Sequence, residues 1–233
     1  GQSGVRSLFW IAAGLAVVAS LLLKALPAGI ESPRASPDIS LSAILRPELI
    51  RLDIYFFVLH ALLTASFVAL PFLIQNHLEI ALMDHWKIYT GALIVSLIGT
   101  VPLILLDDRR GNATTVGLAI ILLLIGQLIL AFGSFAVSPV FIGLALFFAG
   151  FNFLEAGLPA RLSILANGEL RGISFGVFTS SQFLGAFAGG LIGGIFLIDG
   201  QPSQVFIVCA CMTGVWLILH QLSGFRQRQH KKN

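Results

Sequence analysis

The chain contains little charge: Asp, Glu, Lys and Arg make up 11% of its 233 residues, whereas an average soluble protein has about 25%. It also has neither an H-E-x-x-H sequence nor the Gly-Lys-Ser/Thr end of a phosphate-binding loop. These absences argue against a metalloprotease and against an ATP-driven pump, and we expect no enzymatic activity and no cofactor. What the chain does have is 57% apolar residues and a mean hydropathy of +0.93. This composition predicts an integral, all-α membrane protein.

Two groups of residues that elsewhere bind metals or form disulfides carry little weight in this sequence. Cys209 and Cys211 lie two positions apart in an apolar run, so on a helix they point in different directions, and we interpret them as small core residues. A polar connector holds four potential metal ligands, but without a recognised ligand spacing we expect no metal site there. They are His77, Glu79, Asp84 and His85.

Seven apolar stretches have about the length that a membrane-spanning helix needs. They cover residues 8–26, 52–75, 88–106, 114–133, 139–158, 173–197 and 204–222. The first is predicted to be a spanning helix, because a cleaved signal peptide would begin with methionine and a basic region. Residues 27–50 are rich in Pro, Ser and charge and are predicted to form a polar linker. The remaining connections are short, so consecutive helices are expected to run antiparallel.

The basic residues predict how the chain is oriented. The net charge is +3, but the lysines and arginines lie in short loops and a tail and do not form one stripe, so we expect no nucleic-acid partner. If the first helix ends inside the cell, 12 of the 14 basic residues lie on the inner side. The positive-inside rule then places the start of the chain outside and the basic tail in the cytoplasm. This orientation, together with a start at Gly1, suggests a fragment that lacks an odd number of upstream helices.

Three local features resemble the major facilitator superfamily of transporters. The first is the loop sequence Asp108–Arg109–Arg110–Gly111–Asn112, which is similar to the family's D-R-x-G-R gating loop. Asn112 departs from the family's final arginine, and Ile104 stands where the family usually has glycine. Taken alone, the loop could equally be a solvated turn with anchoring charges.

The second feature is a strip of glycines in the stretch 173–197. The strip consists of Gly185, Gly189 and Gly193, with Gly190 and Gly194 alongside. It resembles the glycine-rich sequence that proton-coupled drug antiporters carry in the symmetry-related helix of their first half. Small residues at this spacing also let a second helix approach closely, so tight packing is an equal explanation.

The third feature is the sequence F-N-F-L-E-A-G-L-P at residues 151–159, followed by G-V-F-T-S-S-Q-F-L-G at residues 176–185. Together these stretches resemble a bacterial inner-membrane branch of the drug:proton antiporters. The resemblance implies a proton-coupled efflux carrier working by alternating access in the inner or plasma membrane, with the lipid bilayer, a small molecule, protons and a missing N-terminal half as partners. It also implies four regions along the chain. They are the last helix of that missing half (1–26), a cytoplasmic linker (27–50), a six-helix half (51–222) and a basic tail (223–233).

The candidate site is a group of polar residues in apolar spans. Counting about 1.5 Å per residue from the inner ends puts His60 roughly 12 Å deep, Gln182 roughly 13 Å and Glu155 roughly 9 Å. Thr64, Thr179, Ser180 and Ser181 lie at similar levels. Because an ionisable group at membrane depth is costly unless it is paired or faces water, Glu155 is a candidate for proton exchange, with Asn152 and Gln182 as hydrogen-bond partners. His60 is either a proton acceptor in the cavity or a neutral packing residue.

Two alternatives accompany this hypothesis. Glu155 lies four residues before Pro159, where the apolar span ends, and this position favours a structural brace that pairs the carboxylate with Arg161 or Arg171. At the level of function, a seven-helix receptor or a half-transporter acting as a dimer would also fit the number of spans. The sequence does not indicate which molecule is transported.

Overall fold

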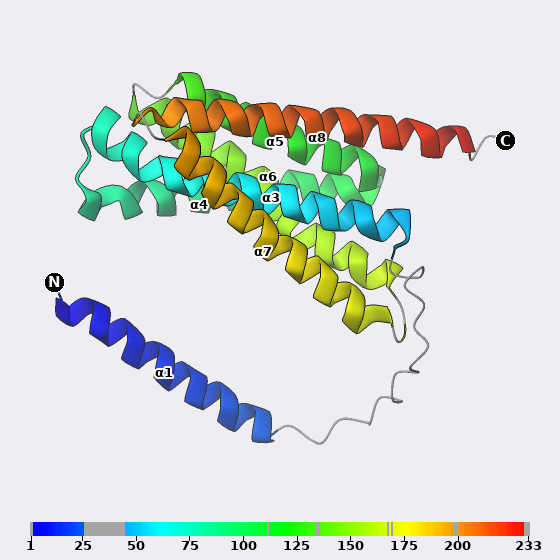
Figure 1. Cartoon of the computed structure of the whole chain (residues 1–233), viewed down its shortest axis with the longest axis horizontal. Helices are drawn as coiled ribbons and strands as arrows, with labels where there is room; N and C mark the ends of the chain where they lie inside the picture. The colour runs from blue at the N-terminus through cyan, green and yellow to red at the C-terminus, as the bar shows by residue number, and fades with distance from the viewer. Residues whose placement is uncertain are drawn as a thin grey trace. The chain divides into compact units, whose positions relative to one another are not determined.

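The computed structural model describes residues 2–25, 45–110, 112–133, 136–166, 168, 170–197 and 200–230. Within these ranges the chain forms helices and no β-strand, which confirms the expected all-α class. The long helices are α1 (Gln2–Ala25), α3 (Pro47–Phe72), α4 (His85–Arg110), α5 (Asn112–Phe132), α6 (Val137–Leu165), α7 (Leu170–Phe196) and α8 (Pro202–His230) (Figure 1). Between α3 and α4 lie a π-helical turn, η1 (Leu73–His77), and a 3-10 turn, η2 (Leu82–Asp84).

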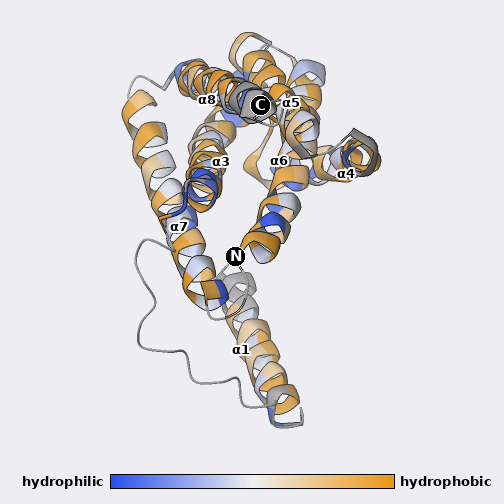
Figure 2. Ribbon diagram, turned by 90° about the vertical axis from the view of Figure 1, so that its right-hand side faces the viewer, coloured by the Kyte–Doolittle hydropathy of each residue, from blue (hydrophilic) through white to orange (hydrophobic). Residues whose placement is uncertain are grey.

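The chain divides into two units, residues 1–38 and 39–233. The second unit contains α3 to α8, which we call the six-helix bundle. All six helices of the bundle are long and apolar enough to cross a membrane, and α1 contributes a shorter apolar stretch, Phe9–Leu22. The bundle's ribbons are hydrophobic on their outward as well as their inward faces (Figure 2), as expected for helices surrounded by lipid. The chain is therefore a multi-pass membrane protein.

Three helix ends differ from the sequence-based expectation. The helix α3 begins at Pro47 with proline in its first turn, α6 continues through Pro159 to Leu165, and α8 continues to His230. An apolar window ends where polar residues begin, but a helix satisfies its own backbone hydrogen bonds and can continue beyond that point. A proline inside a helix removes one hydrogen bond and so need not end it. Glu155 consequently lies ten residues before the end of α6, not at the edge of a loop.

The bundle is organised around α3. This helix packs against α7, α8 and α6, while α5 packs against α6 and α8, and α4 packs against α6 (Figure 1). Its buried residues run along most of its length, from Leu49 to Leu70. Because α3 touches both α6 and α7, polar side chains from these three helices can meet inside the bundle.

Small residues allow close backbone contact between the helices. A Cβ atom added at Gly126 of α5 would lie 2.7 Å from the carbonyl oxygen of Gly143 in α6, and one at Gly150 would lie 2.5 Å from that of Ala119. Van der Waals packing of this kind holds membrane helices together, since lipid tails are as apolar as the side chains and provide little hydrophobic driving force.

The two cysteines of α8 differ in burial. Cys209 is buried and Cys211 is exposed, so the expectation that both are core residues is wrong for Cys211.

One end of the bundle is defined by the starts of α3, α5 and α7 and the ends of α4, α6 and α8. It carries Arg51, Arg161 and Arg171, and we call it the basic end. The opposite end holds η1 and η2 and the exposed Lys87–Asp84 ion pair, 2.7 Å between Nζ and Oδ1. His85 at that end is hydrogen-bonded to the carbonyl oxygen of Ile80 at 3.1 Å. In the part of the chain that the structure describes, no group of His, Cys, Asp and Glu side chains is arranged to hold a metal ion.

Candidate functional site

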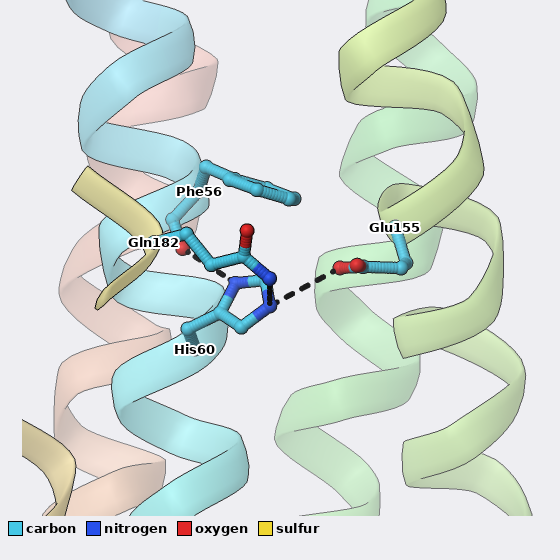
Figure 3. A network of polar contacts seen from close by, with 4 residues as sticks. All are labelled: Phe56, His60, Glu155 and Gln182. Atoms are coloured by element: carbon cyan, nitrogen blue, oxygen red, sulfur yellow. Dashed lines mark hydrogen bonds and ion pairs between the residues drawn. The ribbon is translucent and has the colours of Figure 1, made fainter. Parts of the chain in front are cut away.

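Three helices bring His60, Glu155 and Gln182 together inside the bundle (Figure 3). His60 lies on α3, Glu155 on α6 and Gln182 on α7. The Nε2 atom of His60 is 2.9 Å from Nε2 of Gln182 and 3.5 Å from Oε2 of Glu155. The three residues that depth counting placed in the same half of the membrane thus form a single polar cluster, which we call the His60 cluster.

The hydrogen bonds of His60 define its tautomer. Nδ1 lies 3.1 Å from the carbonyl oxygen of Phe56, and because a carbonyl oxygen only accepts, Nδ1 must carry a proton. In a neutral ring, Nε2 is then an acceptor, which matches the Nε2–H group of Gln182 that donates to it. The lone pair that receives this hydrogen bond also faces Glu155.

The carboxylate of Glu155 is incompletely satisfied. Its Oε2 atom is buried and has no hydrogen-bond partner, although it lies near the His60 ring. A bare carboxylate oxygen facing the lone pair of a neutral imidazole is repulsive, whereas one additional proton, on Glu155 or on His60, converts the contact into an attraction. The geometry therefore provides a place for a proton. The Glu155 side chain is 37% exposed and that of His60 is 7% exposed, so the cluster is more accessible on the Glu155 side.

Aromatic rings hold His60 in place. The ring of Phe56 meets the His60 ring edge-on at 4.4 Å between centroids and is itself stacked on Phe178 of α7 at 4.0 Å. Phe151 of α6 approaches from another side at 5.9 Å. Apolar walls exclude water from the inner side of the imidazole, which strengthens any interaction between His60 and a charged neighbour.

The glycine strip of α7 explains how Gln182 reaches His60. A Cβ atom at Gly185 would collide with the carbonyl oxygen of Phe57, one at Gly189 with that of Ala61, and one at Gly193 would lie 2.7 Å from Cβ of Val68. These three glycines face α3, and Gln182 lies one turn before the first of them. The two neighbouring glycines are less tightly packed. A Cβ atom at Gly190 would lie 3.9 Å from Thr64, and one at Gly194 would meet no atom within 4 Å.

Asn152 does not join the cluster, contrary to the expectation from sequence. Its Nδ2 atom donates to Oγ of Ser96 on α4 at 3.1 Å. Asn152 and Glu155 are three residues apart and so differ by about 60° around α6, and this angle suffices because α6 packs against both α4 and α3. One residue therefore faces α4 and the other faces α3.

The expected pairing of Glu155 with Arg161 is also wrong. Arg161 instead lies 3.4 Å from Oδ1 of Asp107 at the end of α4. Arg171 is exposed at the start of α7, and no ion pair between it and Glu155 occurs in the described part of the chain. The longer α6 accounts for the difference, since it carries Arg161 more than a turn beyond Glu155 along the helix.

The other predicted residues are less closely associated with the cluster. Thr64 is half-buried, Thr179 and Ser180 are exposed, and Ser180 donates to the backbone carbonyl of Gly176 at 2.9 Å. The gating-loop residues lie outside what the structure describes: for Asp108 and Arg109 this concerns the side chains, and for Gly111 the whole residue.

Residues 172–176 read G-I-S-F-G, which matches the G-x-S-x-G pattern of serine hydrolases. That pattern is functional on a sharp turn between a strand and a helix, which exposes the serine. Here Ser174 is 3% exposed and lies within α7, which begins at Leu170. The structural context of a hydrolase nucleophile is not met.

Sequence reasoning missed a second histidine cluster. His220 of α8 contacts the carbonyl oxygen of Ala113 on α5 through Nε2 at 2.8 Å, and Tyr55 of α3 through Nδ1 at 2.8 Å. Trp216 packs edge-on against Tyr55 at 5.3 Å. We call these residues the His220 cluster. A histidine in the last span was visible in the sequence, but its partners come from helices whose rotation the sequence does not specify.

Comparison with known proteins relates the chain to membrane transporters. It is 30% identical over 224 residues to the inner membrane transport protein YajR of Escherichia coli. The aligned region covers 92% of this chain and 48% of that protein. It is 27% identical over 198 residues to an uncharacterized transporter of Buchnera aphidicola subsp. Acyrthosiphon pisum, covering 80% of this chain and 50% of that protein. The chain spans about half the length of these curated relatives. No family model matches it.

Proposed function

We propose that the six-helix bundle is one half of a secondary active transporter that couples the movement of a small molecule to protons. The observation that carries the proposal is the His60 cluster, in which a buried carboxylate oxygen without a hydrogen-bond partner lies 3.5 Å from an imidazole nitrogen. The similarity to proteins named as transporters supports it, as does their length, about twice that of the matched region. A second half would then complete the substrate cavity.

Membership of the major facilitator superfamily, and of its drug:proton antiporter branch, forms part of this proposal. The glycine strip against α3 and the polar residues of α6 and α7 are the features that favour it. Arginines concentrated at the basic end favour a cytoplasmic location of that end in the inner membrane. A seven-helix receptor is not favoured, because the relatives are named as transporters. A self-paired half-transporter is not favoured, because those relatives are about twice as long as the matched region.

The mechanism that we propose relies on one shared proton. In one state His60 is neutral, accepts a hydrogen bond from Gln182, and faces a protonated Glu155. In the other state the proton lies on His60 Nε2, which then donates to the Glu155 carboxylate while the Gln182 amide turns its oxygen toward the ring. Removing the proton altogether restores the repulsion and favours a more open, wetter arrangement of α3, α6 and α7. Such a difference between states is what alternating access requires of a coupling ion.

The test uses the intact transporter reconstituted into liposomes that contain a pH-sensitive dye. Proton entry is followed after adding a panel of amphiphilic cations, and Glu155→Gln is compared with Asp84→Asn, a carboxylate at the opposite end whose partner is Lys87. We expect Glu155→Gln to abolish substrate-dependent proton movement and Asp84→Asn to preserve it. Proton movement that persists at the wild-type rate in Glu155→Gln would leave this residue with a bracing role alone.

A second measurement does not depend on knowing the substrate. Infrared difference spectra between acidic and alkaline buffer report protonated carboxyl groups directly, and a band that disappears in Glu155→Gln but not in Asp84→Asn would assign a titrating carboxyl group to Glu155. If both variants keep the wild-type spectrum, Glu155 does not exchange its proton.

A further inference from the structure

A cavity of about 340 Å³ lies at the basic end, among α3, α5, α6 and α8. This volume is within the usual range of small-molecule sites, roughly 300 to 1,000 Å³. Its polar lining comes from Arg51, Tyr55, Arg161 and His220, with Ser223 at one side. The rest of the lining is mainly aliphatic and includes Leu52, Val116, Leu158, Ile164 and Leu165.

The tyrosine and histidine form a rigid wall of the cavity. Nε2–H of His220 donates to the carbonyl oxygen of Ala113, so Nδ1 accepts the Tyr55 hydroxyl proton, each at 2.8 Å. Both ring nitrogens of His220 are thus occupied within the protein. The wall links α3, α5 and α8, and the arginines complete the polar surface.

The two arginines give the cavity an excess of positive charge. Arg161 lies 3.4 Å from Oδ1 of Asp107, whereas no carboxylate within the described ranges pairs with Arg51. No acidic residue is among those that line the cavity. Two guanidinium groups in a lining without a carboxylate form a site that favours an anion, and the planar fork of arginine suits phosphate oxygens in particular.

We propose that this cavity binds the phosphate group of an amphiphilic anion. Arg51 and Arg161 hold the phosphate, and the aliphatic wall formed by Leu52, Val116 and Leu158 covers an attached hydrocarbon chain. Arg51 lies four residues into α3, about 6 Å along the helix from its start. Arg51 also directly precedes the apolar stretch 52–75, which favours a position near the headgroups of a bilayer, where basic pockets between helices bind anionic lipid headgroups. An anionic phospholipid and a soluble phosphate compound share the required chemistry.

Trp216 provides a reporter for this site, because it is 3% exposed and touches Tyr55 of the cavity wall. The experiment uses the intact protein in a neutral detergent, in a form whose other tryptophans are replaced by phenylalanine. Fluorescence is titrated separately with dihexanoyl phosphatidylglycerol, dihexanoyl phosphatidylcholine and inorganic phosphate. The variants are Arg51→Gln and Arg51→Lys, with Arg171→Gln as a matched control at the same end that does not line the cavity.

We expect saturable binding of phosphatidylglycerol that Arg51→Gln weakens about tenfold, the loss expected for one charge-assisted hydrogen bond. Arg51→Lys should lose less, because it keeps the charge, and Arg171→Gln should change the affinity less than about twofold. Binding of inorganic phosphate alone with the same dependence on Arg51 would support the site and identify a soluble phosphate compound as its occupant.

Two results would overturn the proposal. One is equal weakening by Arg51→Gln and Arg171→Gln, which would reduce the effect to general surface charge. The other is equal affinity for phosphatidylcholine, which carries no net charge. Arg51→Gln could fail to fold, which circular dichroism and size exclusion would show. In that case the affinity of the unaltered protein for phosphatidylglycerol is measured at increasing sodium chloride concentration, and we expect this affinity to fall. Salt-independent binding contradicts an ionic site.

Discussion

Two of the bundle's buried histidines, His220 and His60, lie on different helices and differ in how their ring nitrogens are satisfied. At His220, one nitrogen donates to a carbonyl oxygen and the other accepts a hydroxyl proton, so the neutral ring has one partner per nitrogen. At His60, the Nε2 atom faces both the Gln182 amide and the Glu155 carboxylate. The first arrangement is complete without a further proton, whereas the second is one proton short. Burial alone therefore does not distinguish the histidine that we interpret as structural, His220, from the one that we propose exchanges a proton, His60.

The largest expected effect comes from exchanging each histidine for glutamine. His60→Gln removes the only group that can share a proton with Glu155 in this cluster, and we expect substrate-dependent proton movement in liposomes to fall at least about tenfold. His220→Gln should leave the movement per folded molecule nearly unchanged and lower thermal stability instead. Coupling that survives in His60→Gln, or that is lost in a fully folded His220→Gln, would reverse the two assignments.

A smaller but still large effect is expected for Gly189→Ala. The added methyl group would collide with the carbonyl oxygen of Ala61, force α7 away from α3, and separate Gln182 from His60. Overpacking of this kind costs about 2 kcal/mol. Gly194→Ala is the control, since a Cβ there meets nothing within 4 Å.

The stability of these variants can be measured with a thiol-reactive dye. Cys209 is buried and Cys211 exposed, so a Cys211→Ser background allows the dye to report unfolding through Cys209. Equal melting temperatures for Gly189→Ala and Gly194→Ala would show that α7 adjusts without cost.

Tyr55→Phe tests the hydrogen bond between Tyr55 and His220 in the His220 cluster. The change removes the hydroxyl that donates to Nδ1 of His220, leaves a buried acceptor unsatisfied, and should destabilise the protein by about 1.5 kcal/mol. The same dye assay measures this loss, and proton movement should remain at the wild-type level. Reduced proton movement in Tyr55→Phe would instead connect the two histidines in one pathway.

The smallest effect is expected for Asn152→Ala. Its amide donates to Ser96 on α4, so the variant should lose about 1 kcal/mol of stability, measured by the same dye assay. Proton coupling should be unaffected, although Asn152 lies one turn from Glu155. A loss of coupling comparable to that of Glu155→Gln would place Asn152 functionally with His60 despite its contact with Ser96.

Much of the fold was predictable because it depends on composition along the chain. The apolar stretches of the bundle correspond to its six long helices, and counting depth at a fixed rise per residue put His60, Gln182 and Glu155 in the same half of the membrane. The extent of α6 beyond Pro159 was not predictable from hydropathy, since the helix leaves the apolar window while its backbone bonds continue.

Side-chain partners were less predictable, because they depend on how each helix is rotated about its axis. As a structural brace, Glu155 was expected to pair with Arg161 or Arg171, whereas its carboxylate lies next to His60. Asn152 was expected to bond to Glu155 and instead bonds to Ser96. The contact between Tyr55 and His220 joins residues 165 positions apart. Residue spacing within one helix cannot predict such a contact between two helices. The glycine strip was the most informative signal, since bare backbone is required wherever two helices nearly touch.

Pro159 has a consequence for Glu155 that concerns the backbone. A proline has no N–H group, so within α6 the carbonyl oxygen four residues earlier, that of Glu155, receives no hydrogen bond from it. The turn that bears the acidic side chain is therefore more easily bent than its neighbours. In the mechanism that we propose, a change in the protonation of Glu155 would occur at the turn of α6 that bends most easily.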